Sequence, residues 1–150
     1  ERQLQNTAAT VSSEKMTVLV SSYKQHRCLQ DVIEKFQTCS KVIAEIRVNW
    51  FEDGAPPAKM FGDYVVGYSN ATQAPAVPVV FDDLPNQLSH RFYPRPFSTQ
   101  AIFSMDVDMV FSCGALELAL NTWKKQTDPA QAAVGFYPRY LPPNEYYHCK

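Results

Sequence analysis

The sequence predicts an α/β fold, in which strands and helices alternate around a sheet. Short runs rich in Val and Ile recur along the 150-residue chain, as in strands buried on both faces. Helical periodicity follows two of these runs, and such alternation is typical of βαβ units with a mainly parallel sheet. We therefore expect a Rossmann-like, mixed sheet flanked by helices. In such folds ligands bind beyond the carboxyl ends of the strands.

The first half of the chain contains a polar start, a strand and an amphipathic helix. Residues 1–15 lack any apolar period and are interpreted as a linker or stem, and MTVLVS at 16–21 is the first expected strand. Four apolar residues of the following segment are spaced at i, i+3, i+4 and i+7, which places them on one helical face: Leu29, Val32, Ile33 and Phe36. The domain itself is expected to cover residues 16–150.

The later elements are separated by proline-rich breaks at 54–57 and 82–96, since proline removes a backbone donor and restricts its neighbour. Strands are expected at 42–49, 77–81, 101–107 and 133–137, and a helix at 115–125.

Composition excludes several classes of protein. The net charge of −1 argues against a nucleic-acid-binding surface, and no window approaches eighteen consecutive apolar residues, so no membrane span is expected. The chain starts at Glu1 without a secretory signal pattern, which suggests a segment of a longer protein or a processed chain. A sequon at Asn70 mildly favours a lumenal protein.

Four cysteines without a CxxC pair indicate neither a disulfide scaffold nor a structural zinc site. Cys28 and Cys39 could form a bridge across a short helix, but a pair of buried free thiols is the favoured interpretation.

The sharpest local signal is the run IFSMDVD at 102–108. Side chains alternate along a strand, so Asp106 and Asp108 would project to the same side. Two neighbouring carboxylates repel each other unless a cation lies nearby, and a hard divalent ion that also holds phosphates is the natural partner. The alternative is an Asp that caps the next helix beside a solvated neighbour.

Several segments resemble, in order and spacing, motifs of the exostosin-like glycosyltransferases, glycosyltransferase family 64. The match runs from about Met16 to Arg139. Its parts are SSYKQ at 21–25, VNW at 48–50 with GAP at 54–56, NQLSHRF at 86–92 with Pro94, the strand at 99–108, the helix around Trp123 and VGFYPR at 134–139. The resemblance implies a GT-A fold and identifies this chain with the N-terminal, nucleotide-sugar-binding half of such an enzyme.

The resemblance also implies roles for individual residues. Asn49 would contact the base, and Tyr23 could line the base pocket. Asn86 and Arg91 would grip the nucleotide, Asp106 would lie near the ribose, and Asp108 would bind Mn2+. Val107 stands in the middle of the acidic triplet, where it would lose one contact to ribose or sugar.

Three departures from the family pattern bear on donor affinity. Gln25 replaces a phosphate-facing Arg, and Arg27 has the wrong offset for a simple exchange. Val107 replaces the middle acid, and Ser89 and His90 replace two amides. The family's acidic residue beside the sugar is not recognised in this sequence. We therefore expect the chain to continue into an acceptor-binding half, and the 150 residues alone to bind donor without transferring sugar.

The resulting expectation is a metal-dependent, retaining glycosyltransferase that uses a UDP-sugar, with N-acetylhexosamine as the expected sugar and a glycan or glycolipid as acceptor. It would act in the Golgi or endoplasmic reticulum lumen, and a membrane anchor elsewhere in the parent protein stays open. The alternatives are a non-catalytic nucleotide-sugar or glycan-binding domain and a GDP-sugar-dependent glycolipid glycosyltransferase. A nucleotidylyltransferase ranks last, because residues 21–29 contain no glycine for a phosphate loop.

Overall fold

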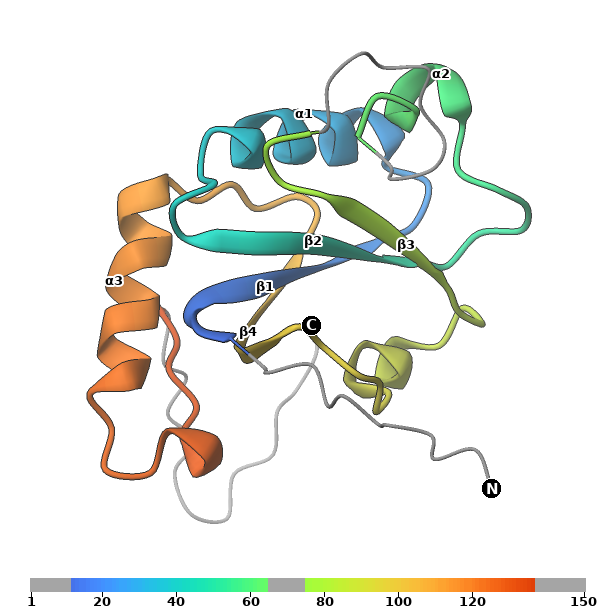
Figure 1. Ribbon diagram of the computed structural model, residues 1–150. Helices are drawn as coiled ribbons and strands as arrows, with labels where there is room; N and C mark the ends of the chain where they lie inside the picture. Colours follow the sequence, from blue (N-terminus) through green and yellow to red (C-terminus); the bar gives the residue numbers. More distant parts are fainter. Residues whose placement is uncertain (1–11, 65–74, 137–150) are drawn as a thin grey trace, which may run out of the picture.

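The computed structural model describes residues 12–64 and 75–136 and contains a four-stranded parallel sheet (Figure 1). The strand order is β3-β2-β1-β4. The strands are β1 (Ser12–Ser22), β2 (Ile43–Trp50), β3 (Val79–Asp83) and β4 (Thr99–Asp106). The predicted α/β fold is confirmed, and its described strands are all parallel.

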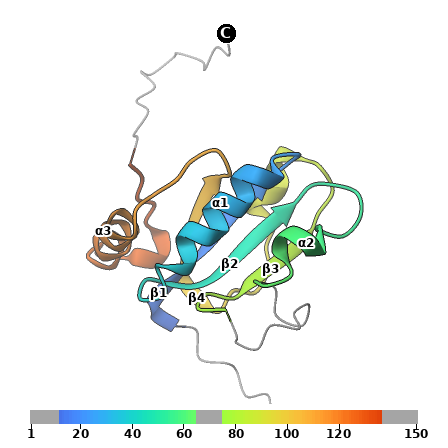
Figure 2. The ribbon, with the colours of Figure 1, turned by 90° about the horizontal axis from the view of Figure 1, so that it is seen from above.

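The helices lie around this sheet as in a Rossmann-like unit. Helix α1 crosses one face of the sheet, α3 stands to one side of it, and the short α2 lies on the side of β3 (Figure 2). The helices are α1 (His26–Gln37), α2 (Ala58–Phe61) and α3 (Cys113–Lys124), with 3-10 turns η1 (Leu88–Phe92) and η2 (Pro129–Gln131). Within the described ranges, no helix combines the length and apolarity that crossing a bilayer requires.

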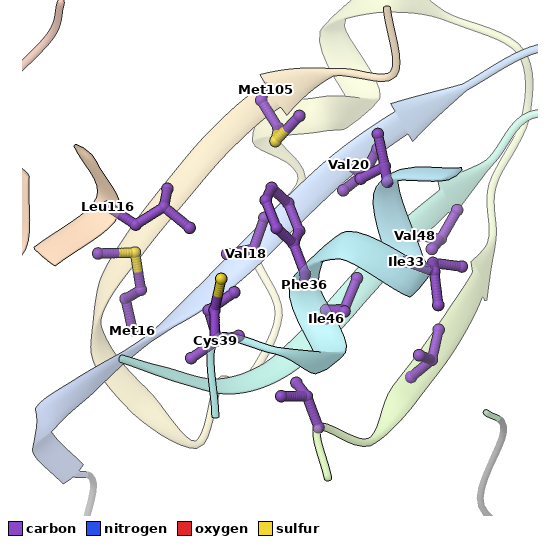
Figure 3. Packing of buried hydrophobic residues seen from close by; sticks show 14 of the residues in the cluster. Met16, Val18, Val20, Ile33, Phe36, Cys39, Ile46, Val48, Met105 and Leu116 are labelled. Atoms are coloured by element: carbon purple, nitrogen blue, oxygen red, sulfur yellow. The ribbon is translucent and has the colours of Figure 1, made fainter. Parts of the chain in front are cut away.

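The core forms between α1 and the sheet face that it covers. Ile33 and Phe36 of α1 point toward Val18 of β1 and Val48 of β2 (Figure 3), and all four side chains are fully buried. The four positions predicted for the apolar face of this helix are its buried residues. Their burial anchors α1, which in turn fixes the turn between β1 and α1 at the carboxyl edge of the sheet.

The order of the strands creates a switch point beside β1. From β1 the chain adds β2 and β3 on one side, and it then returns to place β4 on the other side of β1. Ligands of open α/β sheets bind at such a point, outside the carboxyl ends of the strands.

The element boundaries differ from prediction in two places. Strand β1 begins at Ser12, inside the expected linker, because Ser12 N–H donates to Ser98 O at 3.0 Å and thereby extends the pairing with β4. The strand predicted at 133–137 is wrong for residues 133–136, which pair with no strand in the described part of the chain. Instead, the Phe136 ring stacks on Phe111 with centroids 5.2 Å apart.

The prediction for the cysteines is also wrong. Cys39 is bonded to Cys113 at the start of α3, across 74 residues of sequence and a Cα–Cα distance of 5.3 Å, whereas Cys28 is a free, exposed thiol on α1. The bridge therefore ties the end of α1 to α3. The sequon at Asn70 lies outside the described residues.

Candidate functional site

Polar side chains form a row across the carboxyl end of the sheet. The registers of the three strand pairs align Asp82 of β3, Asn49 of β2, Ser21 of β1 and Asp106 of β4. Partners in a parallel register project to the same face, so this row lies on the face opposite the apolar core. The two outer members are carboxylates and stand on either side of the switch point.

A cavity of about 580 Å³ lies beyond the ends of β1, β2 and β3. Tyr23 and Asn86, two predicted site residues, both line it. The Tyr23 ring is half exposed there. An open cavity with an aromatic ring and an amide can hold a flat, polar ring by stacking and hydrogen bonds. The remaining lining residues are Lys24, Phe51, Glu52, Asp53, Gly54, Asp83, Leu84 and Pro85.

Asn49 is fully buried and does not line this cavity. Its Nδ2 donates to Ser21 Oγ at 3.1 Å, and its Oδ1 accepts from Arg95 Nη2. Both polar atoms of the side-chain amide are therefore engaged inside the protein. The predicted contact of Asn49 with a base stays a prediction, and it requires one of these hydrogen bonds to change partner.

Beneath Asn49 lies an ionic cluster that the sequence did not indicate. Arg47 Nε donates to Asp82 Oδ2 at 3.0 Å, and Arg95 Nε lies 3.3 Å from the same oxygen without the alignment of a hydrogen bond. The three side chains are 9–16% exposed. Burial lowers the pKa of Arg95, the Asp82 charge raises it, and the neighbouring Arg47 lowers it. Arg47 also donates to Pro96 O at 2.9 Å, which fastens the loop after β3 under the sheet.

Arg91 and Asp106, two further predicted site residues, form an ion pair with each other. Both line a second cavity of about 530 Å³, whose other lining residues come mainly from β4, α3 and residues 129–136. Arg91 comes from η1 and Asp106 from the end of β4. The structure thus places Arg91 beside the predicted ribose carboxylate, at a cavity distinct from the one that Asn86 lines.

Val107 and Asp108 lie in the turn after β4. Because the strand ends at Asp106, the expected alternation of a longer strand does not reach Asp108. Val107 packs in the core at 4% exposure, whereas Asp108 is exposed. Helix α3 is capped by Ser112, whose Oγ accepts from Ala115 N–H at 3.1 Å, so the alternative that one of the two Asp residues caps this helix is wrong.

A divalent ion fits this turn only with help from other oxygens. No three His, Cys, Asp or Glu side chains gather into a metal cage in residues 12–64 and 75–136. Asp106 is paired with Arg91, which leaves Asp108 as the free carboxylate of the pair. Hard ions such as Mg2+ are commonly held by one or two carboxylates together with water and substrate phosphates. The donor set therefore suits an ion that arrives with a phosphorylated ligand.

Two comparisons with known proteins relate the chain to glycosyltransferases. The chain is 28% identical to glycosylinositol phosphorylceramide mannosyl transferase 1 of Arabidopsis thaliana over 127 residues, which cover 82% of this chain and 36% of that protein. The chain thus spans about a third of the length of this relative. The model of the glycosyl transferase family 64 domain matches residues 16–148. The chain therefore belongs to glycosyl transferase family 64.

Proposed function

We propose that this chain forms the donor-binding part of a metal-dependent glycosyltransferase, and that a nucleoside diphosphate sugar binds across the switch point of its sheet. One observation carries the proposal: the cavity beyond β1–β3 and the carboxylates at the end of β4 flank the carboxyl end of β1. A donor of this kind has a flat base at one end and, at the other, a diphosphate that needs a cation.

Different residues at this edge of the sheet would bind different parts of the donor. Tyr23 and Asn86 would hold the base in the cavity by stacking and hydrogen bonding. Asp108 would hold the metal ion, which when bound offsets charge on the diphosphate leaving group. Asp106, oriented by Arg91, would accept a hydrogen bond from a ribose hydroxyl.

Two donors, a UDP-sugar and a GDP-sugar, are candidates for this site. The resemblance favours a UDP-sugar, with N-acetylhexosamine as the sugar, a retaining mechanism and an exostosin-like GT-A enzyme. The Arabidopsis relative is named as a mannosyl transferase that acts on a glycosylinositol phosphorylceramide. That name favours the second candidate, a GDP-sugar-dependent transferase with a glycolipid acceptor. A domain that binds the donor without turning it over is the third candidate.

The proposed location is the Golgi or endoplasmic reticulum lumen. The Cys39–Cys113 bridge supports it, because such bridges form and persist in oxidising compartments and are rare in the cytosol.

Asp108→Asn should lower the affinity for Mn2+, measured in the presence of UDP or GDP by calorimetry, by at least roughly tenfold, since even indirect disturbance of a metal site costs that much. Asp106→Asn should cost less, because Arg91 already pairs with that carboxylate. Asp63→Asn, an exposed carboxylate after α2, serves as the matched control.

The same titration with UDP-N-acetylhexosamines and GDP-mannose would identify the donor, and sugar transfer would separate an enzyme from a binding domain. Wild-type affinity for Mn2+ in the Asp108→Asn variant would remove this residue from the metal site. Absence of binding to every nucleotide sugar would contradict the proposed function itself.

A further inference from the structure

The turn between β1 and α1 contains a backbone conformation that L-residues rarely adopt. Lys24 has a φ of 56°, and it is the non-glycine residue with positive φ in residues 12–64 and 75–136. Glycine, and to a lesser degree Asn and Asp, take this conformation most readily. Strained residues of this kind cluster at ligand sites when surrounding contacts hold them. We therefore expect contacts that hold Lys24 in this conformation and a ligand that its side chain could bind.

The contact that supports this conformation comes from Glu52, in the loop just after β2. The Lys24 N–H donates to Glu52 Oε1 at 2.7 Å. The Glu52 carboxylate is itself held, because His26 Nε2 lies 3.0 and 2.9 Å from its two oxygens. The His26 ring stacks on Trp50, with centroids 5.2 Å apart. The strained turn is thus fastened to β2 by a chain of contacts between the first turn of α1 and the end of the neighbouring strand.

The location of the Lys24 side chain indicates which ligand it could bind. Lys24 lines the 580 Å³ cavity, and its Nζ is 5.0 Å from the centroid of the Tyr23 ring. It is the one cationic residue in the lining of that cavity, whose other charged residues are Glu52, Asp53 and Asp83. Without Lys24, an anionic ligand would meet only negative charge there.

The side chains that follow Lys24 bring no other positive charge to this cavity. Gln25, the next residue along the chain, is neutral. Arg27 lies on the exposed surface of α1, where it pairs with Asp31 one helical turn further along. Lys24, by contrast, follows β1 directly after Tyr23, and β1 separates the base cavity from the end of β4. A diphosphate that joins a base in the cavity to a metal at Asp108 must cross this place.

We propose that Lys24 is a donor-binding residue that contacts the diphosphate, and that the Glu52–His26 pair positions it. This inference rests on the proposed function, because it concerns the same site. The left-handed backbone of Lys24 redirects the chain just after the end of β1.

Three variants separate the charge of Lys24 from its backbone conformation. Lys24→Met removes the charge and keeps a flexible side chain of similar length, and Lys24→Arg keeps the charge. Lys24→Gly removes the charge but suits a φ of 56°, so it keeps the shape of the turn. Affinities for UDP and GDP would be measured by calorimetry with Mn2+ at two salt concentrations, and melting temperatures would report stability.

Wild type should bind one of the two nucleotides, UDP or GDP, more tightly. Lys24→Met and Lys24→Gly should each lower the affinity for that nucleotide by roughly tenfold or more, as expected when a hydrogen bond to a charged group is lost. Lys24→Arg should stay within about threefold of wild type, because the charge persists. Lys24→Gly should melt no lower than Lys24→Met. The loss should shrink at high salt, since the lysine is exposed and screened.

The possible results are distinguishable. If Lys24→Gly binds as tightly as wild type, the residue matters only for the shape of the turn, and the inference is wrong. If Lys24→Met binds as tightly, the ammonium does not contact the ligand and the inference is again wrong, while the proposed function stands. If neither UDP nor GDP binds wild type, the proposed function fails first, and the inference fails with it.

Discussion

Asp82→Ala should lower the free energy of unfolding by about 3–5 kcal/mol, the cost of removing one partner from a buried ionic group. Asp82 is the shared anion of Arg47 and Arg95, and all three side chains are largely buried. Without the carboxylate, two neighbouring guanidinium groups would face each other in a poorly solvated place. The loss should affect Arg95 most, because its Nη1 already lacks a hydrogen-bond partner.

Chemical denaturation monitored by circular dichroism measures this cost. Asp83→Ala is the matched control: it removes the next carboxylate along β3, which is exposed, and should change stability by about 0.5 kcal/mol or less. Asp82→Asn, which retains acceptor and shape, should fall between the two. If Asp82→Ala and Asp83→Ala unfolded at the same denaturant concentration, the ionic cluster would contribute nothing to stability.

Loss of the Cys39–Cys113 bridge should cost about 4 kcal/mol, because the bond closes a long loop and restricts the unfolded chain. The expectation applies to the Cys39→Ser, Cys113→Ser double variant. Cys39 is buried between α1 and β2, and the bridge joins this region to the first residue of α3. We therefore expect α3 to separate from the sheet before the strands do.

The melting temperature of the double variant, compared with wild type under oxidising and reducing conditions, measures this contribution. Reductant should lower the melting temperature of wild type to that of the double variant and leave the variant unchanged. Cys28→Ser is the control, since its thiol is free and exposed, and it should melt like wild type. A wild-type protein indifferent to reductant would show that the bridge does not stabilise the domain.

The parts of the fold that are specified locally could be predicted from the sequence. The apolar face of α1 follows from the spacing of Leu29, Val32, Ile33 and Phe36, because a helix imposes its own period on neighbouring residues. The β-branched runs likewise predicted β1, β2, β3 and β4 to within a few residues. Strand ends also indicated the edge where Tyr23 and Asn86 line one cavity.

Features that depend on a distant partner could not be predicted in this way. Cys39 lies 74 residues from Cys113, and nothing in the local pattern distinguishes this pairing from one with Cys28. The engagement of Asn49 by Arg95 depends on how the proline-rich loop returns beneath the sheet. Residues 133–136 have the composition of a strand, but a strand also requires a partner with free hydrogen-bonding groups.

The position of Lys24 shows a third limit. Its cationic side chain is visible in the sequence, but its left-handed backbone is held by Glu52 in the loop after β2, which His26 of α1 contacts in turn. A propensity-based analysis places glycine, not lysine, in such a conformation.

Paramagnetic broadening by Mn2+ tests most directly whether donor and metal meet at the carboxyl end of the sheet. In amide NMR spectra of the protein with UDP or GDP, broadening should be strongest at residues 107–109 and should extend to the turn at 22–24. Thr99, roughly 20 Å away at the opposite end of β4, should keep its signal. At the same Mn2+ concentration, Asp108→Asn should weaken this pattern strongly. Broadening centred on Thr99 or Ile43, at the amino end of the sheet, or an unchanged spectrum would contradict the placement of the site.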